Sequence, residues 1–91
     1  MDLTNYYERI ILEFFIFDDT RMIITDKNIR FQTADSKYIE LSTMLLIYEE
    51  KGKILTFLKV LMEIWDQHEE ELQELQVADV IHDVLQKNYR R

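Results

Sequence analysis

Apolar residues recur at helical spacing over most of this chain and alternate with polar residues in one region before its middle. The longest helical pattern covers residues 53–76. Its apolar seam advances by three or four residues at each step and consists of Leu58, Leu61, Trp65, His68, Leu72 and Leu75. Because an α-helix completes a turn in about 3.6 residues, these side chains share one face. No Gly or Pro interrupts the stretch, so we expect one continuous helix.

The two halves of this helix differ in the width of their apolar face. Over residues 54–65 the seam is flanked by further apolar residues, which is typical of a helix buried in a domain core. Over residues 66–76 the flanks are acidic, and only a narrow stripe remains. A narrow stripe suits contact with one neighbouring helix. We expect the second half to project toward a partner, which is either the chain's own C-terminus or another molecule.

The N-terminal pattern predicts a first helix over residues 6–17. Asn5 and Glu8 have the spacing of a capping box, in which each side chain accepts a hydrogen bond from a free backbone N–H. The apolar positions that follow recur at helical spacing: Tyr6, Tyr7, Ile10, Ile11, Phe14 and Phe15. We interpret this aromatic face as core packing.

A change of period from 3.6 to two predicts three short strands, over residues 21–25, 29–33 and 38–41. Polar turns separate them, which indicates an antiparallel meander. Its apolar face, with Ile29 and Phe31, is expected to lie under helices, and its other face is expected to meet solvent.

Two further helices are predicted in the rest of the chain. Residues 44–51 fit a short helix that Gly52 closes in a left-handed conformation, although residues 44–48 are apolar on every side and a buried strand remains an alternative. After Leu75 the apolar residues shift to the opposite helical face. Either the chain turns near residues 76–79 into a final helix over residues 78–89, or the long helix contacts two bodies.

These elements predict one α+β domain over residues 1–91. It has an N-terminal helix, a short antiparallel β-meander, and two or three C-terminal helices that include the long acidic one.

The net charge of -7 is unevenly distributed, because residues 60–86 hold eight Asp or Glu and no Lys or Arg. This segment would repel phosphates, so direct nucleic-acid binding is disfavoured. The chain has no Cys, no basic and apolar leader, and no apolar run near the roughly 20 residues that span a bilayer. We therefore expect a cytoplasmic protein without membrane contact.

The chain offers few groups for catalysis or for binding a metal or cofactor. It has one Gly and two His, which leaves no phosphate loop and no nucleophilic triad. Asp79 and His82 have a spacing that metal sites in helical bundles use, but such sites need further carboxylates on facing helices. The sequence predicts a non-enzymatic protein with no cofactor and no metal.

The leading hypothesis is an acidic protein-binding module that docks on a basic surface of a partner. One version is a small inhibitor, of phage or plasmid type, of a nucleic-acid-handling protein. The residues expected at the interface are Trp65, Asp66, His68, Glu69, Glu70, Glu71, Leu72, Glu74 and Leu75. The alternatives are that the charge serves solubility, and that the chain is the structural homodimerisation subunit of a small intracellular regulator, paired through Trp65, His68, Leu72 and Leu75.

Overall fold

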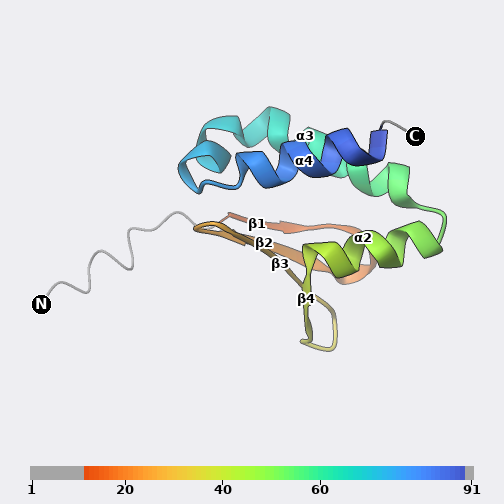
Figure 1. Cartoon of the computed structure of the whole chain (residues 1–91). Coiled ribbons are helices and arrows are strands. Elements are labelled where there is room, and N and C mark those ends of the chain that lie inside the picture. The colour runs from red at the N-terminus through yellow and green to blue at the C-terminus, as the bar shows by residue number, and fades with distance from the viewer. Residues whose placement is uncertain (1–11, 90–91) are drawn as a thin grey trace, which may run out of the picture.

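The computed structural model of this chain describes residues 12–89 and has an α+β fold, as the sequence predicts. Figure 1 shows two long helices on one face of a small sheet, and a shorter helix beside the sheet's edge. In chain order the elements are β1 (Leu12–Phe15), the 3-10 helix η1 (Phe17–Asp19), β2 (Arg21–Thr25), β3 (Asn28–Gln32), β4 (Tyr38–Glu40), α2 (Leu41–Glu50), α3 (Ile54–Glu74) and α4 (Ala78–Tyr89).

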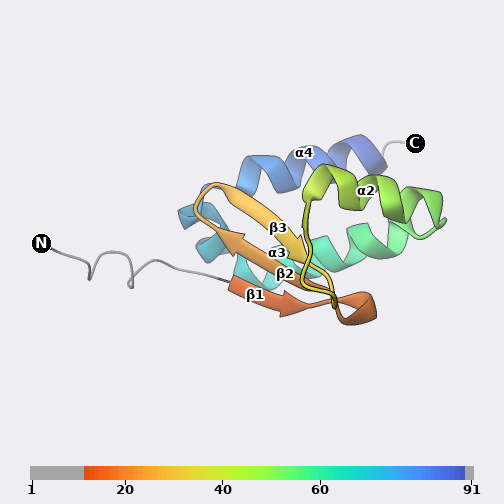
Figure 2. The same ribbon diagram turned by 90° about the horizontal axis from the view of Figure 1, so that it is seen from below.

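The sheet is an antiparallel meander in which the strands follow chain order, β1-β2-β3-β4. Figure 2 shows its open face, with α3 behind it. One inward row aligns Leu12 with Ile24 and Ile29, and the next aligns Phe14 with Met22, Phe31 and Ile39. The predicted strands over residues 21–41 are therefore confirmed, and their inward residues contribute to the core.

The predicted first helix over residues 6–17 is wrong for its described part, because Leu12–Phe15 forms strand β1. Residues 6–11 lie outside the described residues. The run Leu-Glu-Phe-Phe satisfies both periods, since Leu12 and Phe14 also alternate with the exposed Glu13 and Phe15. Pairing with β2 selects the strand over the helix. The backbone hydrogen bonds between β1 and β2 satisfy polar groups along the edge of β2 that would otherwise be unpaired, and aromatic side chains pack well on a sheet.

The next segment is a helix, and the buried-strand alternative for residues 44–48 is excluded. Helix α2 begins at Leu41, three residues before the predicted start, without a side-chain cap. Gly52 has a φ of 71° and ends the helix as predicted. The N–H of Gly52 donates to the carbonyl of Glu49 at 3.0 Å, and the N–H of Lys53 donates to that of Tyr48 at 2.8 Å. These two bonds satisfy carbonyls at the helix end.

The long helix is confirmed, with one break, and of the two alternatives after Leu75 the structure has the turn into a final helix. Within α3, His68 has non-helical angles, φ -131° and ψ 32°. After Leu75 the chain turns into α4 through Gln76, whose φ is 62°. The N–H of Gln76 donates to the carbonyl of Gln73 at 3.1 Å, and that of Val77 donates to the carbonyl of Leu72 at 3.2 Å. This is the same helix ending as in α2, built without glycine.

The core lies between the sheet and the helices and extends to the α3–α4 turn. Its largest fully buried side chains come from the sheet, from α3 and from the turn and first half of α4: Phe31, Phe57, Met22, Ile24, Leu58, Leu61, Leu72, Ile81 and Val77. The β2–β3 turn is attached to this region, because the N–H of Lys27 donates to the carbonyl of Leu75 at 2.7 Å. The end of α3 is thereby fixed to both α4 and the sheet.

Replacing Leu72, which has no solvent exposure, tests the packing of this turn. We expect Leu72→Ala to lower the free energy of unfolding by about 2–5 kcal/mol, because it leaves a cavity that the turn cannot fill. Leu55→Ala is the matched control, since Leu55 is 61% exposed on the same helix; its effect should stay within about 0.5 kcal/mol. Urea denaturation measures both, and equal losses would contradict the packing described above.

The two helix endings give a reciprocal test of backbone strain. We expect Gln76→Gly to stabilise the fold by about 0.5–1 kcal/mol. Glycine removes the strain of about 1–2 kcal/mol that a left-handed conformation imposes on a residue with a Cβ. Its greater conformational freedom in the unfolded chain offsets part of this stabilisation. The reverse exchange, Gly52→Gln, should destabilise, although a Cβ at Gly52 meets no atom within 4 Å. Thermal unfolding of both variants checks the opposite signs.

Candidate functional site

Two of the nine residues expected at the interface are buried within the chain. Leu72 is 0% and Leu75 4% exposed, and both belong to the same core cluster as Val77 and Ile81 from the turn and α4. The narrow stripe therefore packs against the chain's own C-terminal helix. It offers no apolar ridge to another molecule while α4 is in place.

His68 and Glu71 also make contacts within the chain. The ring of His68 lies 5.1 Å from that of Phe14 on β1, measured between centroids. Its Nδ1 lies 3.2 Å from Oε1 of Glu71, one turn further along α3. His68 stands at the break in the helix, and its side chain is 28% exposed. The contact with Phe14 connects α3 to the first strand, so we assign His68 a structural position.

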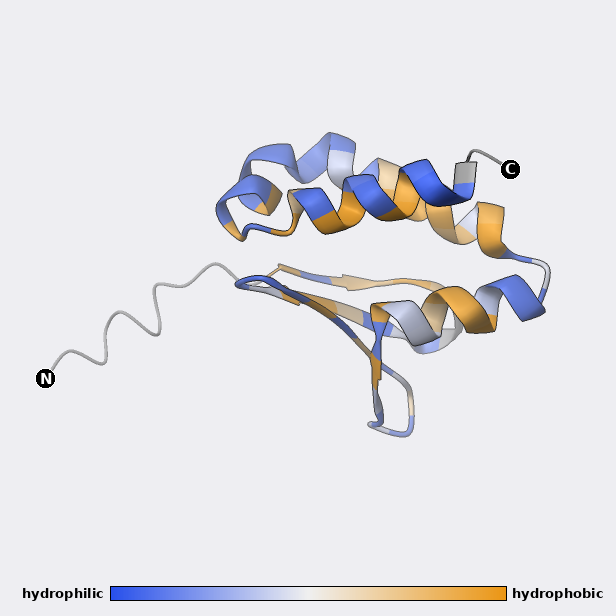
Figure 3. Ribbon diagram, in the orientation of Figure 1, coloured by the Kyte–Doolittle hydropathy of each residue, from blue (hydrophilic) through white to orange (hydrophobic). Residues whose placement is uncertain are grey.

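The remaining acidic residues of the predicted interface are exposed and form a continuous surface on α3. Together with Glu63 they make what we call the acidic face: Glu63, Asp66, Glu69, Glu70 and Glu74. Figure 3 shows hydrophilic residues over the outer side of the second half of α3. The surface arises because every residue that faces away from the seam beyond Trp65 is polar.

No carboxylate of the acidic face forms an ion pair with a Lys or Arg in the described part of the chain, although Lys59 lies one turn before Glu63 on the same helix. Residues 60–86 contain no Lys or Arg. Four Lys and Arg ion pairs lie on the sheet, in the β3–β4 turn and on α4: Arg21–Glu13 at 3.8 Å, Arg30–Glu40 at 3.6 Å, Lys37–Asp35 at 3.8 Å and Lys87–Asp83 at 3.2 Å. The negative charge of α3 is thus left facing solvent.

Apolar side chains border the acidic face on the side of α4. Trp65 is partly exposed, and its ring meets that of His82 on α4 edge-on, with centroids 4.4 Å apart. Met62, one turn earlier, is 42% exposed. The sequence pattern placed Met62 on a broad buried face. It considered His82 only as a metal ligand and gave no sign of its contact with Trp65, which depends on how α4 packs. Trp65 and Met62 supply the accessible apolar surface that Leu72 and Leu75 do not.

A carboxylate with a shifted pKa, that of Asp35, lies away from this surface, in the turn between β3 and β4. The hydroxyl of Thr33 donates a hydrogen bond to Asp35, which lowers the pKa of that carboxyl below its ordinary value. Backbone hydrogen bonds and the ammonium of Lys37 act in the same direction. Because the bonds are local, they order the turn.

Neither a metal cluster nor a membrane-spanning helix is found in residues 12–89. No three His, Asp or Glu side chains gather closely enough there to hold a metal ion. Of the helices in this range, none is both long and apolar enough to cross a bilayer.

Comparison of the chain with protein families, with curated proteins and with solved structures found no match. The candidate site therefore rests on geometry and charge: the acidic face of α3, with Trp65 and Met62 at its border.

Fluorescence of Trp65, the only Trp in the chain, tests the charge of this surface. We expect the cation Cs⁺ to quench Trp65 more strongly than the anion I⁻ at low salt, because uncompensated carboxylates attract cations. The difference should shrink when the Debye length falls to about 3 Å at 1 M salt. It should also shrink in Asp66→Asn/Glu69→Gln. Equal quenching by the two ions at low salt would show that the face is neutralised.

Proposed function

We propose that this chain is a non-enzymatic protein-binding module whose acidic face docks on a basic surface of a partner protein. The observation that carries the proposal is the exposed row of five carboxylates, Glu63 to Glu74, none of which forms an ion pair with a Lys or Arg in the described structure; Lys59, one turn before Glu63, is the only Lys or Arg on α3. A solvated helix face usually mixes both signs of charge, which is sufficient for solubility. A single-sign face creates a field that selects its partner.

Charge and apolar contact have separate roles in such a complex. The carboxylates accelerate the encounter with a basic partner and disfavour acidic ones, with modest effect on the lifetime of the complex. Partly exposed aromatic side chains such as Trp65 commonly supply the binding energy at the centre of an interface. Met62 adds a flexible apolar contact that adapts to its neighbour. The hydrogen bond from the N–H of Lys27 to the carbonyl of Leu75 fixes the end of α3, so that the face is presented on a rigid element.

The proposed partner is a nucleic-acid-handling protein with a basic groove. Such grooves are built to receive closely spaced negative charges, and the acidic face presents carboxylates on successive turns of one helix. Occupying the groove would exclude nucleic acid, which is the action of a small inhibitor of the phage or plasmid type.

The homodimer through the seam of α3 has less support. Leu72 and Leu75 are covered by the chain itself, and His68 contacts Phe14. Pairing through these residues would require α4 to leave its place, for instance by exchange between two chains.

Site-specific crosslinking tests the proposal in cells that naturally produce this protein. A photoreactive phenylalanine derivative at Met62, beside the acidic face, should yield a discrete adduct with one protein. The same group at Tyr38, which is 61% exposed on the sheet, is the control and should not yield that adduct. The adduct should diminish as salt rises from about 50 to 300 mM, because the Debye length falls. The same adduct from both positions would contradict the proposal.

Paired charge variants then separate the acidic face from net charge. Glu69→Gln/Glu70→Gln and Glu13→Gln/Glu40→Gln change the net charge equally, and the second pair lies on the sheet. We expect the first pair to slow association with the crosslinked partner by roughly 10-fold, and the second by less than about 2-fold. Stopped-flow or surface-based kinetics measures both rates. Equal effects would show that overall charge, and not this face, directs binding.

A further inference from the structure

A pocket with a volume of about 400 Å³ lies between the β3–β4 hairpin and α2. Small-molecule sites in proteins commonly have volumes of about 300–1,000 Å³. Figure 1 shows this hairpin on the side of α2 away from α3 and α4, and no residue of either of these helices lines the pocket. Most of the wall is apolar or aromatic and consists of Ala34, Ile39, Met44, Ile47 and Tyr48.

Thr20 lines this pocket and differs from the other polar residues in its burial. It is 5% exposed, and among the residues that the structure describes no other Ser, Thr, Asn, Gln or charged residue is buried. Its backbone is extended, with φ -87° and ψ 133°, and it stands two residues before Met22. Because side chains alternate along an extended chain, Thr20 continues the inward row of β2. Valine would fill the same space without a hydroxyl.

The backbone of Thr20 is satisfied, whereas its hydroxyl has no partner in the described structure. The N–H of Thr20 donates to the carbonyl of Phe17 at 3.1 Å, and its carbonyl accepts from the N–H of Ile16 at 2.8 Å. None of the side-chain hydrogen bonds found in residues 12–89 involves the hydroxyl. In the same range Arg21 Nε is the fully enclosed side-chain polar atom without a partner, so the hydroxyl of Thr20 is not enclosed and opens to the pocket. Buried polar groups almost always have a partner, and this one is free to meet a ligand.

The charged residues that line the pocket are engaged within the chain. Asp35 accepts a hydrogen bond from the hydroxyl of Thr33 and pairs with Lys37 at 3.8 Å. The Nζ of Lys51 lies 5.5 Å from the centroid of the Tyr48 ring. A charged ligand would compete with these contacts. An uncharged ligand leaves them in place.

We infer that this pocket binds a small uncharged molecule of the phenol class, with an apolar ring and one hydroxyl. The ring lies against Tyr48 and Met44, because aromatic rings contact other rings and methionine sulfur favourably. The hydroxyl of the ligand forms a hydrogen bond with that of Thr20, since each hydroxyl can donate or accept. The pocket shares no residue with the acidic face, so this binding is separate from the proposed docking on a partner protein.

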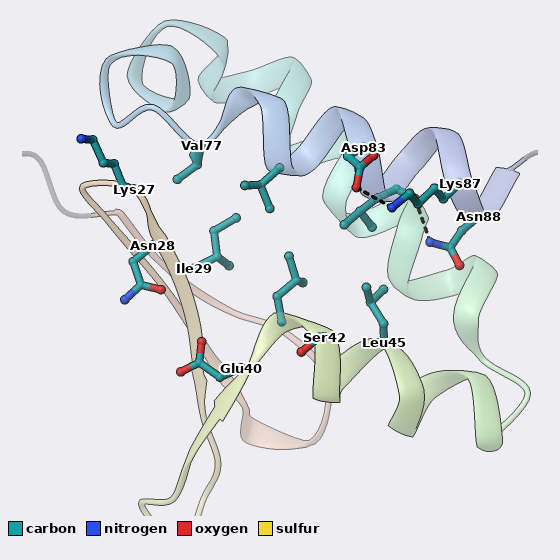
Figure 4. Close-up of a pocket in the computed structure, with 13 residues that line it drawn as sticks. Lys27, Asn28, Ile29, Glu40, Ser42, Leu45, Val77, Asp83, Lys87 and Asn88 are labelled. Atoms are coloured by element: carbon teal, nitrogen blue, oxygen red, sulfur yellow. Dashed lines mark hydrogen bonds and ion pairs between the residues drawn. The ribbon is translucent and has the colours of Figure 1, made fainter.

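The groove between α2 and α4 has no comparable group. Its volume is about 430 Å³, and every polar residue that lines it is at least partly exposed. Figure 4 shows two contacts that already engage polar groups there: Asp83 pairs with Lys87 at 3.2 Å, and the side-chain amide of Asn88 donates to the carbonyl of Val84 at 2.8 Å. A buried hydroxyl that selects a ligand by its chemistry is a property of the Thr20 pocket and not of this groove.

NMR titration of the full chain with p-cresol tests the inference. We expect p-cresol to shift the methyl signals of Ile39, Met44 and Ile47 with a dissociation constant of roughly 0.1–1 mM, as for other small fragments. The matched probe is p-xylene, in which a methyl group replaces the hydroxyl. Thr20→Val should weaken the binding of p-cresol by roughly 3- to 10-fold, the effect of one lost hydrogen bond, and change that of p-xylene by less than about 2-fold.

Two further variants separate the hydroxyl from the shape of the pocket. Thr20→Ser keeps a hydroxyl and should retain the preference for p-cresol that Thr20→Val loses. Thr25→Val makes the same exchange on β2 outside the pocket and should leave both probes unaffected. Thermal unfolding without ligand gives an independent measurement. Thr20→Val should raise the midpoint by roughly 4–8 °C, because a buried hydroxyl without a partner destabilises the fold.

Three results of the titration would overturn the inference. These are no methyl shifts at p-cresol concentrations up to about 10 mM, shifts confined to the groove between α2 and α4, and equal losses of the two probes in Thr20→Val. A lower unfolding midpoint for Thr20→Val would also overturn it, because the hydroxyl would then already have a partner in the folded chain. None of these outcomes depends on whether the acidic face binds a protein.

Discussion

The burial of the α3 seam is the interaction on which the rest of this structure depends. Its first half, with Phe57, Leu58 and Leu61, covers the apolar face of the sheet. Its second half, with Leu72, packs against the turn that leads into α4. One helix thus joins the three parts of a small core. A chain of this size buries only about two-thirds of the surface that it exposes when unfolded. Its small core therefore needs the whole seam for stability, and the seam is not available to a partner.

This use of the seam decides which surfaces remain for function. Because Leu72 and Leu75 are buried in the core, the outward side of the second half of α3 carries only polar and charged residues. Trp65 and Met62 lie at the border of this surface. In the proposed complex, charge steers the encounter and a few apolar atoms anchor it, which suits a partner with a deep basic groove. The acidic face would act there as a rigid set of negative charges.

The pocket of Thr20 arises in a different part of the structure. Thr20 continues the inward row of β2 beyond Met22, to a place that α2 and the β3–β4 hairpin line and in which α3 takes no part. Its hydroxyl is therefore buried without the partner that a packed core or solvent would supply. The acidic face and the pocket use different residues, and each proposal can fail without the other.

The sequence by itself determined the elements whose patterns admit one period: strands β2 to β4, the long helix, and the Gly52 boundary that ends α2. It also determined where negative charge is unopposed, because residues 60–86 contain no base. Tertiary structure decided the rest. Leu12–Phe15 fits a helix or a strand, and the free edge of β2 selects the strand. An apolar stripe looks the same whether it meets its own chain or another, and only the packing of α4 shows that Leu72 and Leu75 are already covered.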